Sequence, residues 1–116
     1  MGATYIERDV EMRLQKALAT MPVVVLSGTR QTGKTTVLKR APALVDRPRI
    51  DLDDFATQAA ARADPMALLA RHPELSVDEV QRVPDLMRAV KVLVDGDRRP
   101  GRFLLSSSAN LLPSTF

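Results

Sequence analysis

Apolar residues recur along this chain with two different periods, and each period indicates a different element. In residues 4–20 the apolar positions recur at helical spacing and charged residues separate them, which is the pattern of an amphipathic helix. These apolar positions are Ile6, Val10, Leu14, Ala17 and Leu18. We expect this helix to pack on the core and to end before Met21-Pro22, because proline disfavours a helical conformation in the residue before it.

Residues 23–26 are consecutive and apolar, and they lie between Pro22 and Ser27-Gly28. A short apolar run between turn residues is typical of a strand that is buried on both faces of a parallel sheet. Further helical patterns and short apolar runs follow in alternation. They predict a helix over 34–40, a weak strand over 48–52, a helix after Asp53-Asp54, a helix from Asp64-Pro65 to near His72-Pro73, a strand over 74–80, a helix over 84–95, a loop over 95–101 and a strand beginning at 102–105.

This alternation predicts an α/β fold. Strands joined by right-handed helical crossovers form a three-layer sandwich, with helices on both faces of a mostly parallel sheet of about four strands. In such sheets ligands bind at the carboxyl ends of the strands. Polar residues that directly follow a predicted strand are therefore the first candidates for a site.

The turn after residues 23–26 carries a phosphate-binding pattern. Gly28, Gly33, Lys34 and Thr35 occupy every fixed position of G-x-x-x-x-G-K-[ST], between a predicted strand and a predicted helix. The glycines let the backbone approach a polyphosphate closely. Backbone N–H groups and the helix N-terminus attract its oxygens. The sequence therefore predicts a P-loop, or Walker A loop, whose cofactors are ATP and Mg²⁺.

Two side chains of this loop have individual roles in the prediction. Lys34 would bridge the β- and γ-phosphates as a point charge and so assist catalysis, and the Thr35 hydroxyl would ligate Mg²⁺. The residues expected to contact the nucleotide are Gly28, Thr29, Arg30, Gln31, Thr32, Gly33, Lys34, Thr35 and Thr36.

An acidic pair, Asp78-Glu79, ends the apolar run at 74–80. Downstream of a P-loop, an Asp at such a strand end holds Mg²⁺, usually through water, and the next Glu orients and deprotonates the attacking water, as in Walker B motifs. Neighbouring residues of a strand point to opposite faces, so the two carboxylates converge only if the chain bends there.

Two further polar groups allow two interpretations each. Residues 106–110, Ser-Ser-Ser-Ala-Asn, follow the last strand, where they either reach the γ-phosphate and the attacking water or are simply turn residues. Asp53 and Asp54 either cap the following helix or place a carboxylate near the magnesium site, and capping is the preferred interpretation.

Composition limits the other possible functions. The 116 residues allow one domain with a modest core, and the net charge of +3 with a pI near 9.8 suits a nucleic acid, a polyphosphate or a solvated surface. An aromatic content of 3% opposes a stacking platform for single strands. Without cysteine the chain has no disulfide or thiolate site, which fits a cytoplasmic location. We expect no membrane span, because no apolar run approaches about 18 residues.

Four segments together resemble one family, the prokaryotic AAA-type ATPases that carry a poorly characterised C-terminal domain. They are Gly-Thr-Arg-Gln-Thr-Gly-Lys-Thr-Thr at 28–36, Leu-Asp-Asp at 52–54, Val-Asp-Glu-Val-Gln-Arg-Val-Pro at 77–84, and Asp-Arg-Arg-Pro-Gly-Arg-Phe-Leu-Leu-Ser-Ser-Ser-Ala-Asn at 97–110. The resemblance covers nearly the whole chain in the right order.

The resemblance implies a role for each matching residue. It implies a P-loop NTPase-like core in which Lys34 and Thr35 bind phosphate and Mg²⁺ and Asp78 supports the metal. It further implies that Glu79 is the catalytic base and that a polar residue, Ser108 or Asn110, senses the γ-phosphate.

The sequence departs from the family pattern in two respects. Ser107 stands where the family usually has glycine, and the chain stops at Phe116, where family members continue. We therefore expect a truncated protein, with a lead-in helix over 1–20 and an incomplete ATPase core over 21–116. The missing fifth strand would leave the strand before the P-loop with an exposed edge, which is a liability for association.

These observations favour an ATP-binding core that hydrolyses ATP weakly or not at all in isolation. One alternative is a fully competent ATPase that couples hydrolysis to a partner, and another is a DNA-linked ATPase that needs a partner. A third is a non-catalytic module that associates through its open sheet edge with a second copy or a completing chain. Arg98 and Arg99 are either an arginine finger for a neighbouring subunit or, as we prefer, a solvated loop pair.

Overall fold

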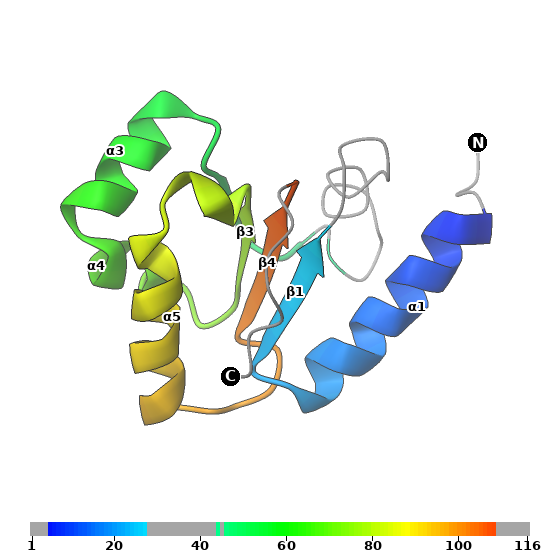
Figure 1. Cartoon of the computed structure of the whole chain (residues 1–116). Coiled ribbons are helices and arrows are strands. Elements are labelled where there is room, and N and C mark those ends of the chain that lie inside the picture. Colours follow the sequence, from blue (N-terminus) through cyan, green and yellow to red (C-terminus); the bar gives the residue numbers. More distant parts are fainter. Residues whose placement is uncertain (1–4, 28–43, 45, 109–116) are drawn as a thin grey trace.

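The computed structural model describes residues 5–27, 44 and 46–108, in which strands and helices are interspersed along the chain (Figure 1). The elements are α1 (Tyr5–Thr20), β1 (Val23–Ser27), β2 (Arg49–Asp51), α3 (Phe55–Ala63), α4 (Pro65–Leu69), β3 (Leu75–Asp78), a 3₁₀ helix (Val80–Arg82), α5 (Asp85–Gly96) and β4 (Phe103–Ser107).

The strands form one sheet in the order β1-β4-β3-β2, and every described pairing is parallel. The central strands β3 and β4 are buried along their whole length, as expected for strands covered on both faces. The predicted α/β fold with a mostly parallel sheet of about four strands is therefore confirmed, and its class is P-loop NTPase-like.

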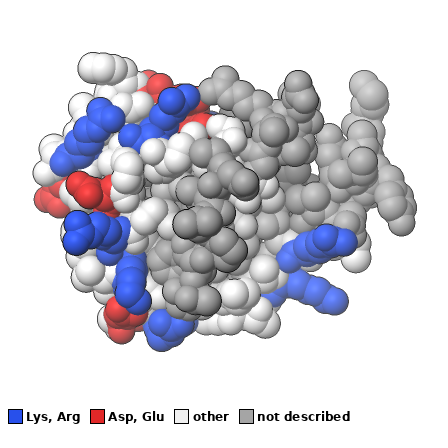
Figure 2. All heavy atoms as spheres, in the orientation of Figure 1, with Lys and Arg blue, Asp and Glu red and all other residues white. Residues whose placement is uncertain are grey.

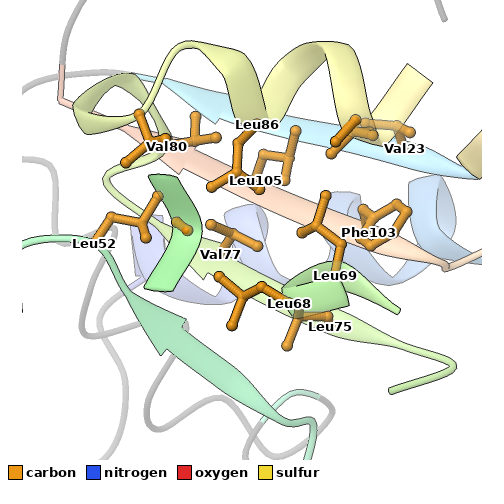
Figure 3. Packing of buried hydrophobic residues seen from close by; sticks show 14 of the residues in the cluster. Val23, Leu52, Leu68, Leu69, Leu75, Val77, Val80, Leu86, Phe103 and Leu105 are labelled. Atoms are coloured by element: carbon orange, nitrogen blue, oxygen red, sulfur yellow. The ribbon is translucent and has the colours of Figure 1, made fainter. Parts of the chain in front are cut away.

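Helices cover both faces of this sheet, which makes three layers (Figure 1). Successive residues of β4 point to opposite faces. Leu104 lies in a small cluster with Leu14 of α1, and Phe103 and Leu105 lie in the larger cluster with side chains of α3, α4 and α5. Figure 3 shows Leu86 of α5 and Leu105 in this larger cluster. Burial of each such side chain stabilises the fold by about 1.5–3 kcal/mol.

One prediction about β1 holds for only part of the strand. The apolar run at 23–26 does form a strand, and Val23 and Val24 are buried in the clusters on opposite faces of the sheet, but Val25 is 37% exposed. In the described part of the chain β1 pairs only with β4, so it lies at an edge of the sheet and has a neighbouring strand on one side. The edge position itself agrees with what the resemblance implies.

Several predicted boundaries also move. The helix that starts at Asp64-Pro65 is confirmed at its start, where Asp64 accepts a hydrogen bond from the N–H of Ala67, but it ends at Leu69 rather than near His72-Pro73. The residues after Leu69 form the connection to β3, which begins at Leu75. Helix α5 continues to Gly96, which shortens the predicted loop over 95–101, and the weak strand over 48–52 is confined to 49–51. The helix predicted over 34–40 lies outside the described residues.

Candidate functional site

Because all described pairings are parallel, the carboxyl ends of the strands lie together. We call this the carboxyl edge of the sheet, to distinguish it from the side edge that strand β1 forms. Ser27, the last residue of β1, pairs with Ser107, and Asp51, the last residue of β2, pairs with Asp78. The chain after Ser27 therefore leaves the sheet at this edge, with β4 between it and β3. Adjacent strands are about 4.8 Å apart, so the ends of β1 and β3 are about 10 Å apart.

Some of the predicted site residues lie outside the described part of the chain. They are Gly28, Thr29, Arg30, Gln31, Thr32, Gly33, Lys34, Thr35, Thr36 and Asn110. Their roles stay predictions. The described part of the site consists of the ends of β2, β3 and β4 and the 3₁₀ helix.

Asp78 ends β3 and is 2% exposed. The hydroxyl of Ser106, on the neighbouring strand β4, donates a hydrogen bond to its Oδ1. Arg49 Nη1, at the start of β2, lies 3.4 Å from its Oδ2. A carboxylate without such partners would be costly to bury. These contacts therefore keep a carboxylate fixed at the strand end.

Glu79 leaves the strand in a left-handed backbone conformation, with φ 59° and ψ 48°. This is the bend that the sequence required, because an extended Glu79 would point to the face opposite Asp78. The side chain is 4% exposed, and its Oε2 accepts hydrogen bonds from Ser108 Oγ at 2.8 Å and Gln81 Nε2 at 2.7 Å. Its N–H lies 3.4 Å from Ser106 Oγ. Both acidic residues therefore contact serines of one strand and its extension.

The serines at 106–108 are placed by strand β4, which continues past the predicted run to Ser107. Ser106 and Ser107 are strand residues and fully buried, so their interpretation as turn residues is wrong. Ser106 and Ser108 are two positions apart and meet Asp78 and Glu79 respectively. The strand periodicity of two explains why alternate serines reach the same acidic pair.

The interpretation of Asp54 as a helix cap is confirmed. Its Oδ2 accepts hydrogen bonds from the N–H of Thr57 at 3.0 Å and from Thr57 Oγ1 at 2.8 Å. These two bonds lower the pKa of the Asp54 carboxyl below its usual value. Asp53 instead pairs with Arg82 Nε at 2.9 Å, which ties the end of β2 to the 3₁₀ helix.

Arg98 and Arg99 lie before β4, at the sheet edge opposite Asp78 and Glu79. Arg98 pairs with Asp95 at 3.8 Å, and Arg99 pairs with Asp97 at 3.5 Å. These exposed pairs favour the interpretation as a solvated loop pair over an arginine finger. On the face shown in Figure 2, basic and acidic side chains of the described residues are interspersed.

Sequence reasoning assigned no role to Gln81 and Arg49. Gln81 lies two positions after Glu79 and reaches back to it through the turn of the 3₁₀ helix. Its signal in the sequence was its place inside the family-like segment 77–84. Arg49 had no local signal, because its partner Asp78 is distant in the sequence and becomes a neighbour only when β2 pairs with β3.

A fit to Mg²⁺ depends on the chemistry of these donors. Within the described ranges no group of three or more His, Cys, Asp or Glu side chains could hold a metal ion. Magnesium, however, keeps several waters and binds proteins through one or two carboxylates together with substrate phosphates. The buried carboxylate of Asp78 at the strand end fits that mode of binding, in which phosphate and water would supply the remaining ligands.

The parallel sheet, its helical layers and the acidic pair at a strand end define an α/β protein of the P-loop NTPase-like class. A family model described as an AAA domain matches residues 20–115. The chain therefore belongs to the AAA domain family, as the sequence resemblance indicated. Membership indicates a nucleotide-binding, ATPase-like protein.

Relatives among curated proteins extend beyond the matched region. Uncharacterised proteins of Mycobacterium bovis and Mycobacterium tuberculosis are each 40% identical to the chain over 104 residues. These matches cover 89% of this chain and 23% of each relative, so the chain spans about a quarter of the length of these relatives. No solved structure matches the chain significantly. Among the described residues, no helix is long and apolar enough to cross a membrane.

Proposed function

We propose that this chain binds Mg-ATP at the carboxyl edge of its sheet and is the nucleotide-binding part of an AAA-type ATPase. The observation that carries the proposal is the buried pair Asp78-Glu79 at the end of β3, which Ser106 of β4 and Ser108 just after it hold. The G-x-x-x-x-G-K-T pattern begins directly after β1, at the same edge of the sheet.

Each residue has a separate task in this proposal. Lys34 and the backbone of residues 28–35 bind the phosphates, and the Thr35 hydroxyl and Asp78 hold the magnesium ion, Asp78 through water. The ion neutralises charge on the phosphates when it is bound. Glu79 orients a water molecule and accepts its proton.

We propose that hydrolysis by the isolated chain is weak or absent. Loss of an arginine finger alone costs roughly 10³–10⁵ in rate. Arg98 and Arg99, before β4, pair with Asp95 at the end of α5 and with Asp97, at the opposite edge of the sheet. A full rate would then need a neighbouring subunit or the remainder of a longer protein.

A second candidate function is association through the side edge of the sheet, which strand β1 forms. In the described part of the chain β1 has one strand partner, and Val25 on it is 37% exposed. An apolar edge strand is a template for pairing with another chain. The partner would be a second copy or a strand that completes the sheet.

Thermal unfolding with and without saturating Mg-ATP tests the first proposal. A ligand at about 100 times its dissociation constant stabilises the folded state by roughly 2.7 kcal/mol. For a domain near this size the midpoint should rise by on the order of 10 °C. Lys34→Ala should abolish the rise. Lys91→Ala is the matched control, because it removes the same charge from an exposed ion pair with Asp95 on α5 and should leave the rise intact.

The remaining outcomes separate the two candidate functions. A midpoint that ignores Mg-ATP in the wild type would contradict nucleotide binding. If the wild type then self-associates in sedimentation velocity, and Lys34→Ala associates equally, the sheet-edge function is the better account. A rise that persists in Lys34→Ala would contradict the role of the P-loop lysine.

A further inference from the structure

The side-chain amide of Gln81 forms a closed triangle with Glu79, the proposed base, and Ser108, whose hydroxyl donates to it. Its Nε2 lies 2.7 Å from Glu79 Oε2 and 3.4 Å from Ser108 Oγ, and Ser108 Oγ itself lies 2.8 Å from Glu79 Oε2. One carboxylate oxygen therefore accepts two hydrogen bonds, one from the 3₁₀ helix and one from Ser108, directly after β4.

The orientation of this amide follows from charge. A glutamine amide has donors on its nitrogen and an acceptor on its oxygen. If the amide of Gln81 were reversed, its oxygen would lie where Nε2 now is, 2.7 Å from a carboxylate oxygen of Glu79. Two acceptors at that distance repel each other, so the nitrogen faces Glu79 and the oxygen Oε1 faces away.

The environment of the amide oxygen of Gln81 is a second observation that points to a role for this residue. Gln81 Oε1 is buried and has no hydrogen-bond partner in the described structure. Buried polar atoms normally have a partner, and an exception requires an explanation, such as a catalytic role or a bound water. Since the nitrogen of the same amide is held by Glu79, the oxygen is an acceptor fixed in its orientation.

The backbone supports the same arrangement. Glu79 has φ 59°, a backbone conformation that residues other than glycine adopt rarely. The 3₁₀ turn that follows is closed by a hydrogen bond of 3.0 Å from Arg82 N–H to Glu79 O. Unusual backbone conformations of this kind persist where the surroundings hold them, often at functional sites. Here the turn brings Gln81 back beside Glu79.

We propose that Gln81 is a positioning residue for Glu79. Its amide and the Ser108 hydroxyl hold one oxygen of the carboxylate, so that the carboxylate keeps one orientation, and its free Oε1 accepts a hydrogen bond from the water that Glu79 orients. This inference rests on the proposed ATPase function for its catalytic consequence, but the contact between Gln81 and Glu79 is testable without nucleotide.

The first test is the NMR spectrum of the ¹⁵N-labelled chain without nucleotide. The side-chain amide signals of Gln81 are assigned by their loss in Gln81→Met, an apolar residue of similar length. In Glu79→Ala they should move to the position of a free glutamine amide, because their acceptor is gone. The amide of Gln58, whose Nε2 donates to Leu52 O at 2.8 Å, is the internal control and should not move. Gln81 signals that stay in place would overturn the proposal.

The second test separates positioning from a structural role. In Gln81→Met the kcat for ATP should fall by about 10²-fold, the effect of a catalytic group displaced by about 1 Å, while the thermal shift with Mg-ATP stays equal to that of the wild type. Gln58→Met should keep both values. A kcat unchanged in Gln81→Met, or a loss of kcat matched by a loss of the thermal shift, would overturn the positioning role.

The two proposals fail in different ways. If the wild type shows no thermal shift with Mg-ATP, the nucleotide site is wrong, and the NMR comparison still decides whether Gln81 holds Glu79. If the wild type binds Mg-ATP without measurable turnover, the NMR comparison decides the contact by itself. If it binds and turns over, both tests must agree.

Discussion

Arg47 is the side chain whose removal should reveal most about how the strands are held together. Its side chain is 6% exposed and joins the segments that enter β3 and β4. Nε donates to Ser76 Oγ at 3.1 Å, and Nη2 donates to the backbone oxygens of Leu75 and Gly101 at 3.2 and 2.7 Å. Nη1 pairs with Glu74 at 2.8 Å. The residue also borders a cavity of about 560 Å³ at the amino ends of the strands.

The expected cost of Arg47→Met follows from these contacts. Hydrogen bonds to a charged group contribute about 1.5–3 kcal/mol each, and a buried carbonyl left without a donor costs about 1–3 kcal/mol. Against this, burial lowers the pKa of the Arg47 guanidinium, only partly opposed by the charge of Glu74, so desolvation of the charge cancels part of the gain. We expect a net loss of about 2–4 kcal/mol in the free energy of unfolding.

The ion pair with Glu74 contributes little to that figure. The Glu74 side chain is 61% exposed, and exposed pairs stabilise by about 0–1 kcal/mol. Glu74→Gln should therefore cost less than about 1 kcal/mol. The matched pair of variants separates the buried hydrogen bonds of Arg47 from its surface charge.

Urea unfolding of the two single variants and the double variant measures both quantities. The reasoning is refuted if Arg47→Met costs no more than Glu74→Gln, or if its cost disappears in the Glu74→Gln background. Either result would mean that the ion pair, and not the hydrogen bonds to Ser76, Leu75 and Gly101, is what matters. An unchanged denaturant slope would show that the denatured state is the same in all variants.

Two further predictions concern the backbone and pH. Gly101 has φ 76°, and a Cβ there would lie 3.0 Å from the carbonyl oxygen of Leu18, so Gly101→Ala should destabilise the fold by about 1–3 kcal/mol. Gly96→Ala is the control and should not destabilise it, because nothing lies within 4 Å of a Cβ at Gly96. Equal effects of the two substitutions in urea unfolding would contradict this. The pKa of Asp54 is lowered by Thr57, so its stabilising effect is complete above the usual value of 3.8 and is lost as the pH falls through the lower folded-state value. The difference in melting temperature between wild type and Asp54→Asn should therefore shrink below about pH 4, and a constant difference would disprove it.

The predictions that succeeded from sequence are those whose signal is local. The cap of α3 by Asp54 and the start of α4 at Asp64-Pro65 depend on residues a few positions apart. The same holds for the amphipathic helix that became α1 and for the strand that ends in Asp78. A short-range pattern of apolar and polar residues carries this information directly.

What the sequence left open or only partly right depends on neighbours in space. The run at 23–26 indicates a strand buried throughout, and Val23 and Val24 are buried, yet Val25 is 37% exposed because β1 has only one described strand beside it. The sequence left open whether the serines at 106 and 107 are turn residues, and they are strand residues because β4 continues alongside β1. The local sequence does not show which strands pair, so only the tertiary structure decides these points.

By itself, the sequence determined the class of the fold, the order of the elements, the P-loop pattern and the acidic pair after the third strand, because each is written in a short stretch of chain. Only the tertiary structure decided the contacts of that acidic pair. Ser106 reaches Asp78, and Ser108 reaches Glu79, across 28 and 29 positions of sequence. Such contacts arise when parallel strands align their carboxyl ends, and no local pattern encodes which residues then become neighbours.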